Sequence, residues 1–315
     1  MRLSVIAFRK DFAYNCISLK ANCIYNLFEK DERIMMMNAI QEYITYLHDV
    51  KKTSYNTEIS YKRDLRNAAA YLEEQRVSSF ESATETNLYS YMLYLEREKK
   101  SAATVSRSIA SLRSFYQYLL REHKIDKDPS EHLKAPRVEK KVPEILTIDE
   151  ADRLLAQPDR KKNKGLRDRA MLQLLYCTGI RVSELVHLKM EDVNLDLGYI
   201  ICRENSRERI IPMTQGTRII LDEYLESARD SLLKGKESEY LFCNCSGGEM
   251  SRQGFWKVLK VYAQDAGIKK DITPHTMRHS FAAHQLQKGT DIHSVQRMLG
   301  HAGVTTMQMY KDLAK

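Results

Sequence analysis

The strongest constraint on the fold of this chain is a proline-rich, basic segment near its middle. Three of the six prolines lie within fifteen residues: Pro129, Pro136 and Pro143. Because proline lacks a backbone donor and fixes its φ angle, such a segment continues neither a helix nor a central strand. We therefore predict a basic linker at 129–146, between a domain at 35–128 and a second domain at 147–315.

The first 34 residues differ from the rest of the chain. The short apolar run after Arg2 is interrupted by Arg9 and Lys10, which is too early for a secretory signal peptide. We interpret residues 1–34 as an N-terminal extension of little functional role. A functional arm is the alternative.

The predicted first domain is helical. Apolar residues recur at helical spacing over four stretches: 38–50, 54–76, 84–99 and 101–123. The other faces of the last stretch carry small hydroxyl groups and arginines. These groups suit contact with a phosphate backbone, although an ordinary solvated face explains them equally well. The candidate DNA-binding residues are Thr104, Arg107, Ser108 and Arg113, with Lys140 and Lys141 in the linker.

Composition narrows the class of protein. The net charge of +8 favours a polyanionic partner. The six cysteines show no paired metal-ligand spacing, so we predict free cytosolic thiols and neither a zinc site nor disulfides. No apolar run approaches the roughly 20 residues that a membrane span requires. The composition therefore predicts a cytoplasmic protein without a bound metal.

The predicted second domain opens with a capping box at 147–150 and is mainly helical. Two short strands, 199–202 and 210–213, flank a polar turn at 204–207. Helices are expected at about 166–177, from Arg181 onward, and at 217–233, 251–265 and 274–288. The predicted fold class is mainly α, with a small β-hairpin in the C-terminal half.

Two arginine motifs in this domain suit an anionic ligand. His275 and Arg278 are three residues apart at the start of a predicted helix, so both project from one face. A helix N-terminus also presents free N–H groups to an anion. Arg181 begins another helix, and Glu184 can pair with it and hold its planar fork in place. Taken singly, each motif also fits an ordinary surface helix.

A late histidine and a late tyrosine complete the set. His301 follows Gly300, at which a helix is expected to stop, and Tyr310 lies on the next helix. A single late tyrosine is more often a core aromatic than a nucleophile. Next to two arginines and two histidines, however, a tyrosine can attack a phosphodiester whose charge the arginines neutralise.

The order and spacing of these motifs closely resemble the signature of the tyrosine recombinases, also called phage integrases. The lengths of both halves resemble the Xer-type branch of that family, and the resemblance covers about residues 38–315. The segments that carry it are 104–119, 178–185, 207–212, 274–284, 299–301 and 305–310.

The resemblance implies a role for each residue. Tyr310 would attack the scissile phosphate, form a 3′-phosphotyrosyl bond and release a 5′-hydroxyl. Arg181 and Arg278 would clamp the phosphate. His275 would take the tyrosine proton or position the phosphate, and His301 would donate a hydrogen bond to a non-bridging oxygen. No nucleotide cofactor or metal would be needed, because the covalent link conserves the bond energy.

The resemblance also implies partners. Two domains would clamp double-stranded DNA bearing inverted-repeat half-sites, and a homo- or hetero-tetramer would act on two DNA sites in the nucleoid. The role would be chromosome dimer resolution, with a DNA translocase or accessory protein, or movement of a mobile element. Five residues follow Tyr310, fewer than in most Xer-type members, so the contact between protomers stays open.

One departure from the family concerns the general acid for the leaving 5′-oxygen. The family places a lysine in the hairpin turn, but this slot holds Glu204, or Arg203 if the hairpin is one residue shorter. Arginine holds its proton too firmly to be a good acid. Electrostatic help from an arginine is one explanation. The alternative function is that of a DNA-binding homologue with weak or no cleavage. A third functional class is a topoisomerase that relaxes DNA by the same tyrosine chemistry.

Overall fold

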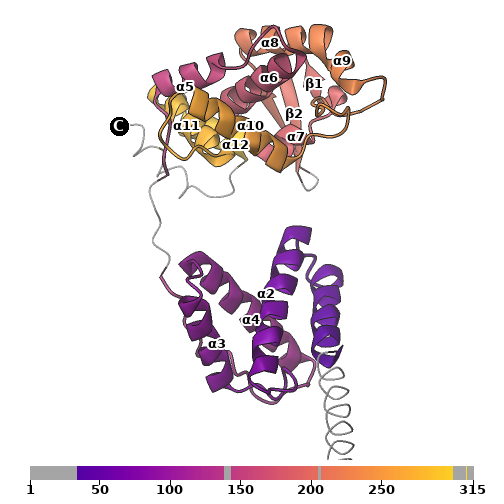
Figure 1. Ribbon diagram of the computed structural model, residues 1–315, viewed down its shortest axis with the longest axis vertical. Coiled ribbons are helices and arrows are strands. Elements are labelled where there is room, and N and C mark those ends of the chain that lie inside the picture. Colours follow the sequence, from indigo (N-terminus) through magenta and orange to yellow (C-terminus); the bar gives the residue numbers. More distant parts are fainter. Residues whose placement is uncertain (1–33, 138–142, 205–206, 301–309, 311–315) are drawn as a thin grey trace, which may run out of the picture. The chain divides into compact units, whose positions relative to one another are not determined.

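The computed structural model describes residues 34–137, 143–204, 207–300 and 310, and the chain divides into two compact units between Lys140 and Lys141 (Figure 1). This division falls inside the predicted linker at 129–146. Each unit has its own hydrophobic core. Among the described residues, no helix is long and apolar enough to cross a membrane. No described group of three or more His, Cys, Asp or Glu side chains could hold a metal ion.

The first unit is a bundle of helices around an aromatic core. Its helices are the described part of a first helix at 34–49, α2 (Tyr55–Glu74), α3 (Glu85–Arg97) and α4 (Ala102–Arg121). The last three begin where a side-chain oxygen accepts a hydrogen bond from a backbone N–H three residues on, at Ser54, Thr84 and Ser101. The four predicted helices are therefore present.

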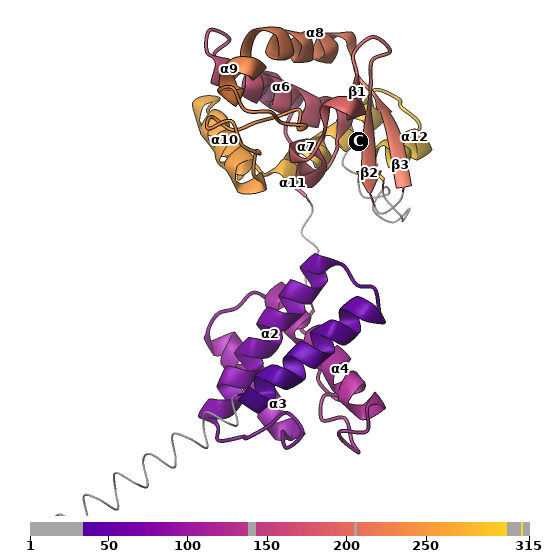
Figure 2. The ribbon, with the colours of Figure 1, turned by 90° about the vertical axis from the view of Figure 1, so that its right-hand side faces the viewer.

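The second unit combines a three-stranded antiparallel sheet with helices. The strands are β1 (Val193–Asn194), β2 (Tyr199–Glu204) and β3 (Arg207–Pro212), in the order β1-β2-β3. Figure 2 shows this sheet at one side of the unit, with α12 next to β3. The helices are α5 (Ile148–Ala156), α6 (Asn163–Thr178), α7 (Val182–Val186), η1 (Met190–Asp192), α8 (Gln215–Tyr224), η2 (Leu225–Arg229), α9 (Asp230–Leu233), α10 (Arg252–Asp265), α11 (Pro274–Gln287) and α12 (Ile292–Leu299). A mainly helical fold with a small sheet is thus confirmed.

Two local predictions for this unit are corrected. The polar turn predicted at 204–207 is shorter, because Arg203 pairs with Glu208 and both strands extend through polar residues. An ion pair between these two side chains stabilises the strand ends in place of apolar contacts. The helix predicted at 217–233 contains a π-helical turn, η2. Arg229 at its end donates hydrogen bonds to three carbonyls of the segment 238–241.

Candidate active site

Helix α11 carries His275 and Arg278 on successive turns. The helix begins at Pro274 because the Thr273 hydroxyl accepts a hydrogen bond from the Thr276 N–H, and the Thr276 hydroxyl accepts one from the Thr273 N–H. His275 is exposed, whereas Arg278 is buried. The first turns of α11 therefore place an imidazole at the surface and a guanidinium in the interior of the unit.

The Arg278 guanidinium joins the ends of two other helices. It donates hydrogen bonds to the carbonyls of Gly179, just after α6, and Leu299, at the end of α12, each at 2.5 Å. Burial and then the nearby Arg181 lower the pKa of Arg278 to about 10. Arg278 still carries its charge at neutral pH, so a bound anion would offset both unfavourable effects.

Arg181 lies at the start of α7, directly after a left-handed turn. At Gly179 φ is 61°, and a Cβ there would lie 2.2 Å from the Phe281 ring, so only glycine fits. Glu184 Oε2 accepts a hydrogen bond from the Arg181 backbone N–H at 2.7 Å, and Glu184 Oε1 lies 3.4 Å from Arg181 Nη1. Arg181 Nη2 also donates to the Gly300 carbonyl at 3.4 Å. The turn thus directs Arg181 toward the end of α12, which Arg278 also contacts.

Tyr310 is the described residue of the C-terminal segment, and it is buried. Only 1% of it is exposed, and it packs in a small apolar cluster with Phe281, Val295 and Leu299. Burial raises the pKa of the Tyr310 hydroxyl, while the charge of Arg278 acts in the opposite direction. The phenol is therefore protonated at neutral pH and lies within the electrostatic reach of Arg278.

A histidine that the sequence analysis did not single out contacts the tyrosine. His279 Nδ1 lies 2.7 Å from the Tyr310 hydroxyl, and their ring centroids are 5.5 Å apart. Burial, His275 and Arg278 lower the pKa of His279 to about 4, so the imidazole is neutral at physiological pH and shares a hydrogen bond with the tyrosine hydroxyl. The spacing of four residues from His275 puts both histidines on one face of α11, and this signal could have found His279.

The depressed pKa of His279 predicts a dependence of stability on pH. Between pH 4 and 6.5, His279 binds a proton in the unfolded chain but not in the folded protein. The free energy of unfolding should therefore fall as the pH falls through this window. The contribution is up to about 3 kcal/mol. Chemical denaturation at pH 4.5, 5.5 and 6.5 should give a shallower pH dependence for His279→Phe than for the wild type. His293→Phe, at an exposed histidine of α12, is the matched control, and an unchanged slope in His279→Phe would contradict the assignment.

Three predicted site residues, His301, Lys140 and Lys141, lie outside the described residues. The structure places the residue before His301, because Gly300 ends α12 in the left-handed region with φ 64°. The Arg181 and Arg278 contacts at Gly300 and Leu299 therefore lie next to the point where the chain continues to His301.

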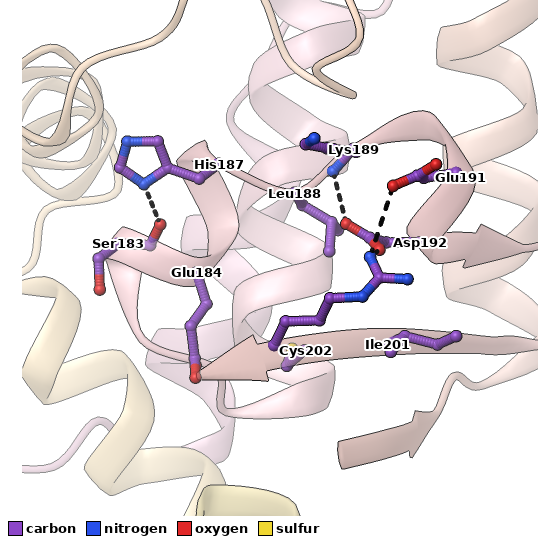
Figure 3. A pocket seen from close by; sticks show the side chains of 10 residues that line it. Ser183, Glu184, His187, Leu188, Lys189, Glu191, Asp192, Ile201 and Cys202 are labelled. Carbon is purple, nitrogen blue, oxygen red and sulfur yellow. Dashed lines mark hydrogen bonds and ion pairs between the residues drawn. The ribbon is translucent and has the colours of Figure 1, made fainter. Parts of the chain in front are cut away.

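A pocket between α7, η1 and β2 contains Arg203, one of the two residues considered for the hairpin acid. Figure 3 shows Glu191 and Asp192 on one side of this pocket and Glu184 on the other. Arg203 forms ion pairs with Asp192, with Glu191 at 3.7 Å and with Glu208 at 3.0 Å. Three carboxylates surround one guanidinium, so Arg203 offers no net positive charge to a leaving oxygen in this arrangement.

In the first unit, the α4 residues predicted to contact DNA have internal partners. Thr104 shares a hydrogen bond with the Ser101 hydroxyl at the start of the helix. Arg113 donates to the Glu131 and Leu133 carbonyls. Ser108 is buried, so its hydroxyl does not present a surface to DNA. Contacts of Thr104 and Arg113 with DNA stay predictions.

Arg107 of α4 forms a bidentate pair with Asp64 of α2. The nitrogen–oxygen distances are 2.7 and 2.9 Å, and the Asp64 side chain is 2% exposed whereas that of Arg107 is 36% exposed. Asp64 is a buried carboxylate that needs this partner. Arg107 therefore joins two helices of the unit, whether or not it also contacts DNA.

We expect Arg107→Leu to destabilise the first unit by about 2–3 kcal/mol, because it leaves the Asp64 carboxylate buried without a counterion. Urea denaturation followed by circular dichroism measures this change. The exposed α2 residue Arg66 provides the control, since Arg66→Leu should change stability by less than about 0.5 kcal/mol. Equal stabilities for the two variants would show that the Asp64 pair contributes little.

A buried tyrosine beside two arginines is a set of groups that suits a phosphodiester ligand. The phage integrase family matches residues 144–315, and the phage integrase N-terminal SAM-like domain matches residues 40–123. The tyrosine recombinase XerD of Oceanobacillus iheyensis is 43% identical over 286 residues, which cover 89% of this chain and 95% of the relative. The XerD of a Staphylococcus epidermidis strain is 41% identical over 281 residues, with the same coverage.

Solved structures give the same fold. A XerH site-specific recombinase bound to a palindromic difH substrate, in a post-cleavage complex, aligns with a TM-score of 0.73 and 20% identity over 91% of this chain and 94% of its own. A lambda integrase dimer bound to a COC′ core site aligns with a TM-score of 0.68 and 18% identity over 87% and 94%. The chain belongs to the phage integrase family, the tyrosine recombinases. It is a site-specific recombinase that cuts and rejoins DNA strands.

Proposed function

We propose that Tyr310 is the nucleophile and that Arg181 and Arg278 clamp the scissile phosphate. The supporting observation is the convergence of these groups on one turn. Arg278 donates a hydrogen bond to the Leu299 carbonyl and Arg181 donates one to the Gly300 carbonyl. Arg181 and Tyr310 are both close enough to Arg278 to influence its pKa. A phosphodiester bound beside this turn would meet two cations next to a phenol.

The chemistry follows from these positions. The phenol oxygen of Tyr310 attacks phosphorus, the bond from phosphorus to the 5′-oxygen breaks, and the 5′-oxygen takes up a proton. The 5′-hydroxyl of a partner duplex then attacks the 3′-phosphotyrosyl bond and restores the tyrosine. One phosphodiester is exchanged for another, so neither a nucleotide cofactor nor a metal is required.

The histidines divide the proton and hydrogen-bonding roles. His279 already contacts the Tyr310 hydroxyl, but a pKa of about 4 makes it a weak base, so we assign it the orientation of the phenol. The exposed His275 would position the phosphate or take the proton. His301 would donate to a non-bridging oxygen, and Glu184 would support Arg181.

The proposed substrate is double-stranded DNA with inverted-repeat half-sites, bound by four protomers on two sites in the nucleoid of the cytoplasm. The palindromic substrate of the similar XerH protein supports this symmetry. The role would be chromosome dimer resolution, with a DNA translocase or accessory protein as the candidate partner, or the integration and excision of a mobile element.

A covalent trap tests this function. The Tyr310→Phe variant first selects bound sites from a pool of random duplexes, since it should bind DNA without cutting it. A selected site is then made with a nick close to the expected cleavage point, so that the cut fragment diffuses away and the phosphotyrosyl adduct accumulates. Wild-type protein should form an adduct that resists denaturing gel electrophoresis, and Tyr310→Phe should form none.

Each other outcome has a distinct meaning. An adduct that persists in Tyr310→Phe would exclude Tyr310 as the nucleophile. Specific binding without any wild-type adduct would instead favour a DNA-binding homologue. Relaxation of supercoiled plasmids that lack a selected site would favour a topoisomerase.

A further inference from the structure

Arg209 on β3 is a third guanidinium at the proposed phosphate site. Its Nη2 donates to Glu184 Oε1 at 2.7 Å, and its side chain is 14% exposed, beside a Glu184 side chain that is 9% exposed. The same carboxylate accepts the backbone N–H of Arg181 and lies 3.4 Å from its Nη1. One nearly buried carboxylate therefore holds two arginines that are 28 residues apart in the sequence.

The Arg209 guanidinium also lies against the turn that ends α12. A Cβ added at Gly300 would be 2.1 Å from Arg209 Nη1 and 2.7 Å from its Cζ, so the guanidinium lies directly over the glycine. Arg181 donates to the carbonyl of this same glycine, and Arg278 donates to the carbonyl before it. Three guanidiniums thus hold one turn, from which the chain continues to His301.

The charges of these groups suit the transition state better than the substrate. Burial raises the pKa of the neighbouring Cys202 thiol to about 12, so Cys202 stays neutral. Arg181, Arg209, Arg278 and Glu184 then sum to a net charge of +2. A phosphodiester carries one negative charge, and attack by a phenolate brings a second. Fixed charges that match the later state lower the barrier without tightening the binding of the substrate equally.

We propose that Arg209 is a positioning residue for strand cleavage. Through Glu184 it holds Arg181 in place, and over Gly300 it holds the turn that leads to His301. This inference rests on the proposed function of Arg181. A purely structural Arg209 would tie β3 to α7 and α12 without affecting the charge at the phosphate, and the two roles predict different substrate dependence.

The test measures single-turnover cleavage of the nicked trap substrate at saturating protein, together with the Kd for DNA. Arg209→Gln should cleave about 100-fold more slowly than wild type, because a small displacement of a phosphate-binding group has an effect of this size. Its Kd should change by less than about threefold, since substrate binding depends mainly on the many backbone contacts. Arg209→Lys keeps the charge but not the planar fork, so it should lose about 10-fold.

A second substrate separates positioning from structure. It carries a methyl group in place of one non-bridging oxygen of the scissile phosphate, so its transition state has one negative charge less. If Arg209 acts through the clamp, the deficit of Arg209→Gln should shrink to less than about 10-fold on this substrate. Arg218→Gln is the matched control, because Arg218 donates to the Asp196 carbonyl in the same unit and should cleave both substrates as wild type does.

Three outcomes would overturn the inference. The first is cleavage by Arg209→Gln at the wild-type rate. The second is an equal deficit of both Arg209 variants on the charged and the neutral substrate, as a folding defect would produce. A wild-type protein that forms no adduct would instead remove the proposed function, and the inference with it. The thermal unfolding of both variants is measured together with their cleavage rates. If Arg209→Gln does not fold, the rates of Arg209→Lys on the two substrates still decide the test.

Discussion

Arg278→Lys is expected to slow strand cleavage by about 1,000-fold, the size of effect seen when a fixed cationic donor is removed from a charged transition state. Arg278 donates to the Gly179 and Leu299 carbonyls with two nitrogens of one planar group. The single ammonium of lysine cannot reproduce this fork, so both the charge at the phosphate and the turn at Leu299 would shift. Single-turnover cleavage of the trap substrate measures the effect.

A control separates the chemical loss from a loss of folding. Arg278 is buried, and each carbonyl left without a donor costs about 1–3 kcal/mol, so the melting temperature should fall as well. The rates are therefore compared at a temperature at which thermal unfolding shows Arg278→Lys to be folded. Arg218→Lys, made in the same unit, should keep the wild-type rate. If folded Arg278→Lys also cleaves within a few-fold of wild type, Arg278 does not clamp the phosphate.

The second large effect concerns the 5′-leaving group. The family lysine is absent from the hairpin, and Arg203 is surrounded by Asp192, Glu191 and Glu208. If no side chain protonates the leaving oxygen, a substrate with sulfur in place of the bridging 5′-oxygen should be cleaved about 100- to 10,000-fold faster, because a thiolate leaves without a proton. Adduct formation on matched oxygen and sulfur substrates measures the ratio.

A substitution in this chain gives the complementary result. Glu204→Lys restores the family residue to its slot, so it should speed cleavage of the oxygen substrate and leave the sulfur substrate nearly unchanged. Glu226→Lys, at an exposed residue of η2, makes the same change in net charge outside the hairpin and serves as the control. Equal rates on the two substrates in the wild type would show that another group already supplies the proton.

Much of the fold could be predicted because its signals are local. Thr273 and Pro274 mark the start of α11, and Gly179 and Gly300 mark the ends of α6 and α12. The ends of β2 and β3 could not be predicted, since Arg203 and its neighbours have the composition of a turn. Only the pairing of Arg203 with Glu208 across the strands shows that they belong to the sheet.

For the site, the sequence could predict only contacts between residues that lie close together in the chain. Arg181 and Glu184 are three residues apart, so their contact follows from helix geometry. The contact of Arg209 with Glu184 joins a strand to a helix, and that of Arg107 with Asp64 joins two helices. No local pattern predicts such long-range pairs, which is why the sequence predicts Arg107 only as a DNA contact and does not single out Arg209.

Identification of the modified residue shows directly whether Tyr310 carries the DNA. Trapped adduct is digested with nuclease and trypsin and analysed by tandem mass spectrometry. Cleavage after Arg297 and Lys311 gives a peptide, 298–311, in which Tyr310 is the single tyrosine. We expect a nucleotide 3′-phosphate on Tyr310 in this peptide. A nucleotide on any other peptide, or on His301 within this one, would contradict it.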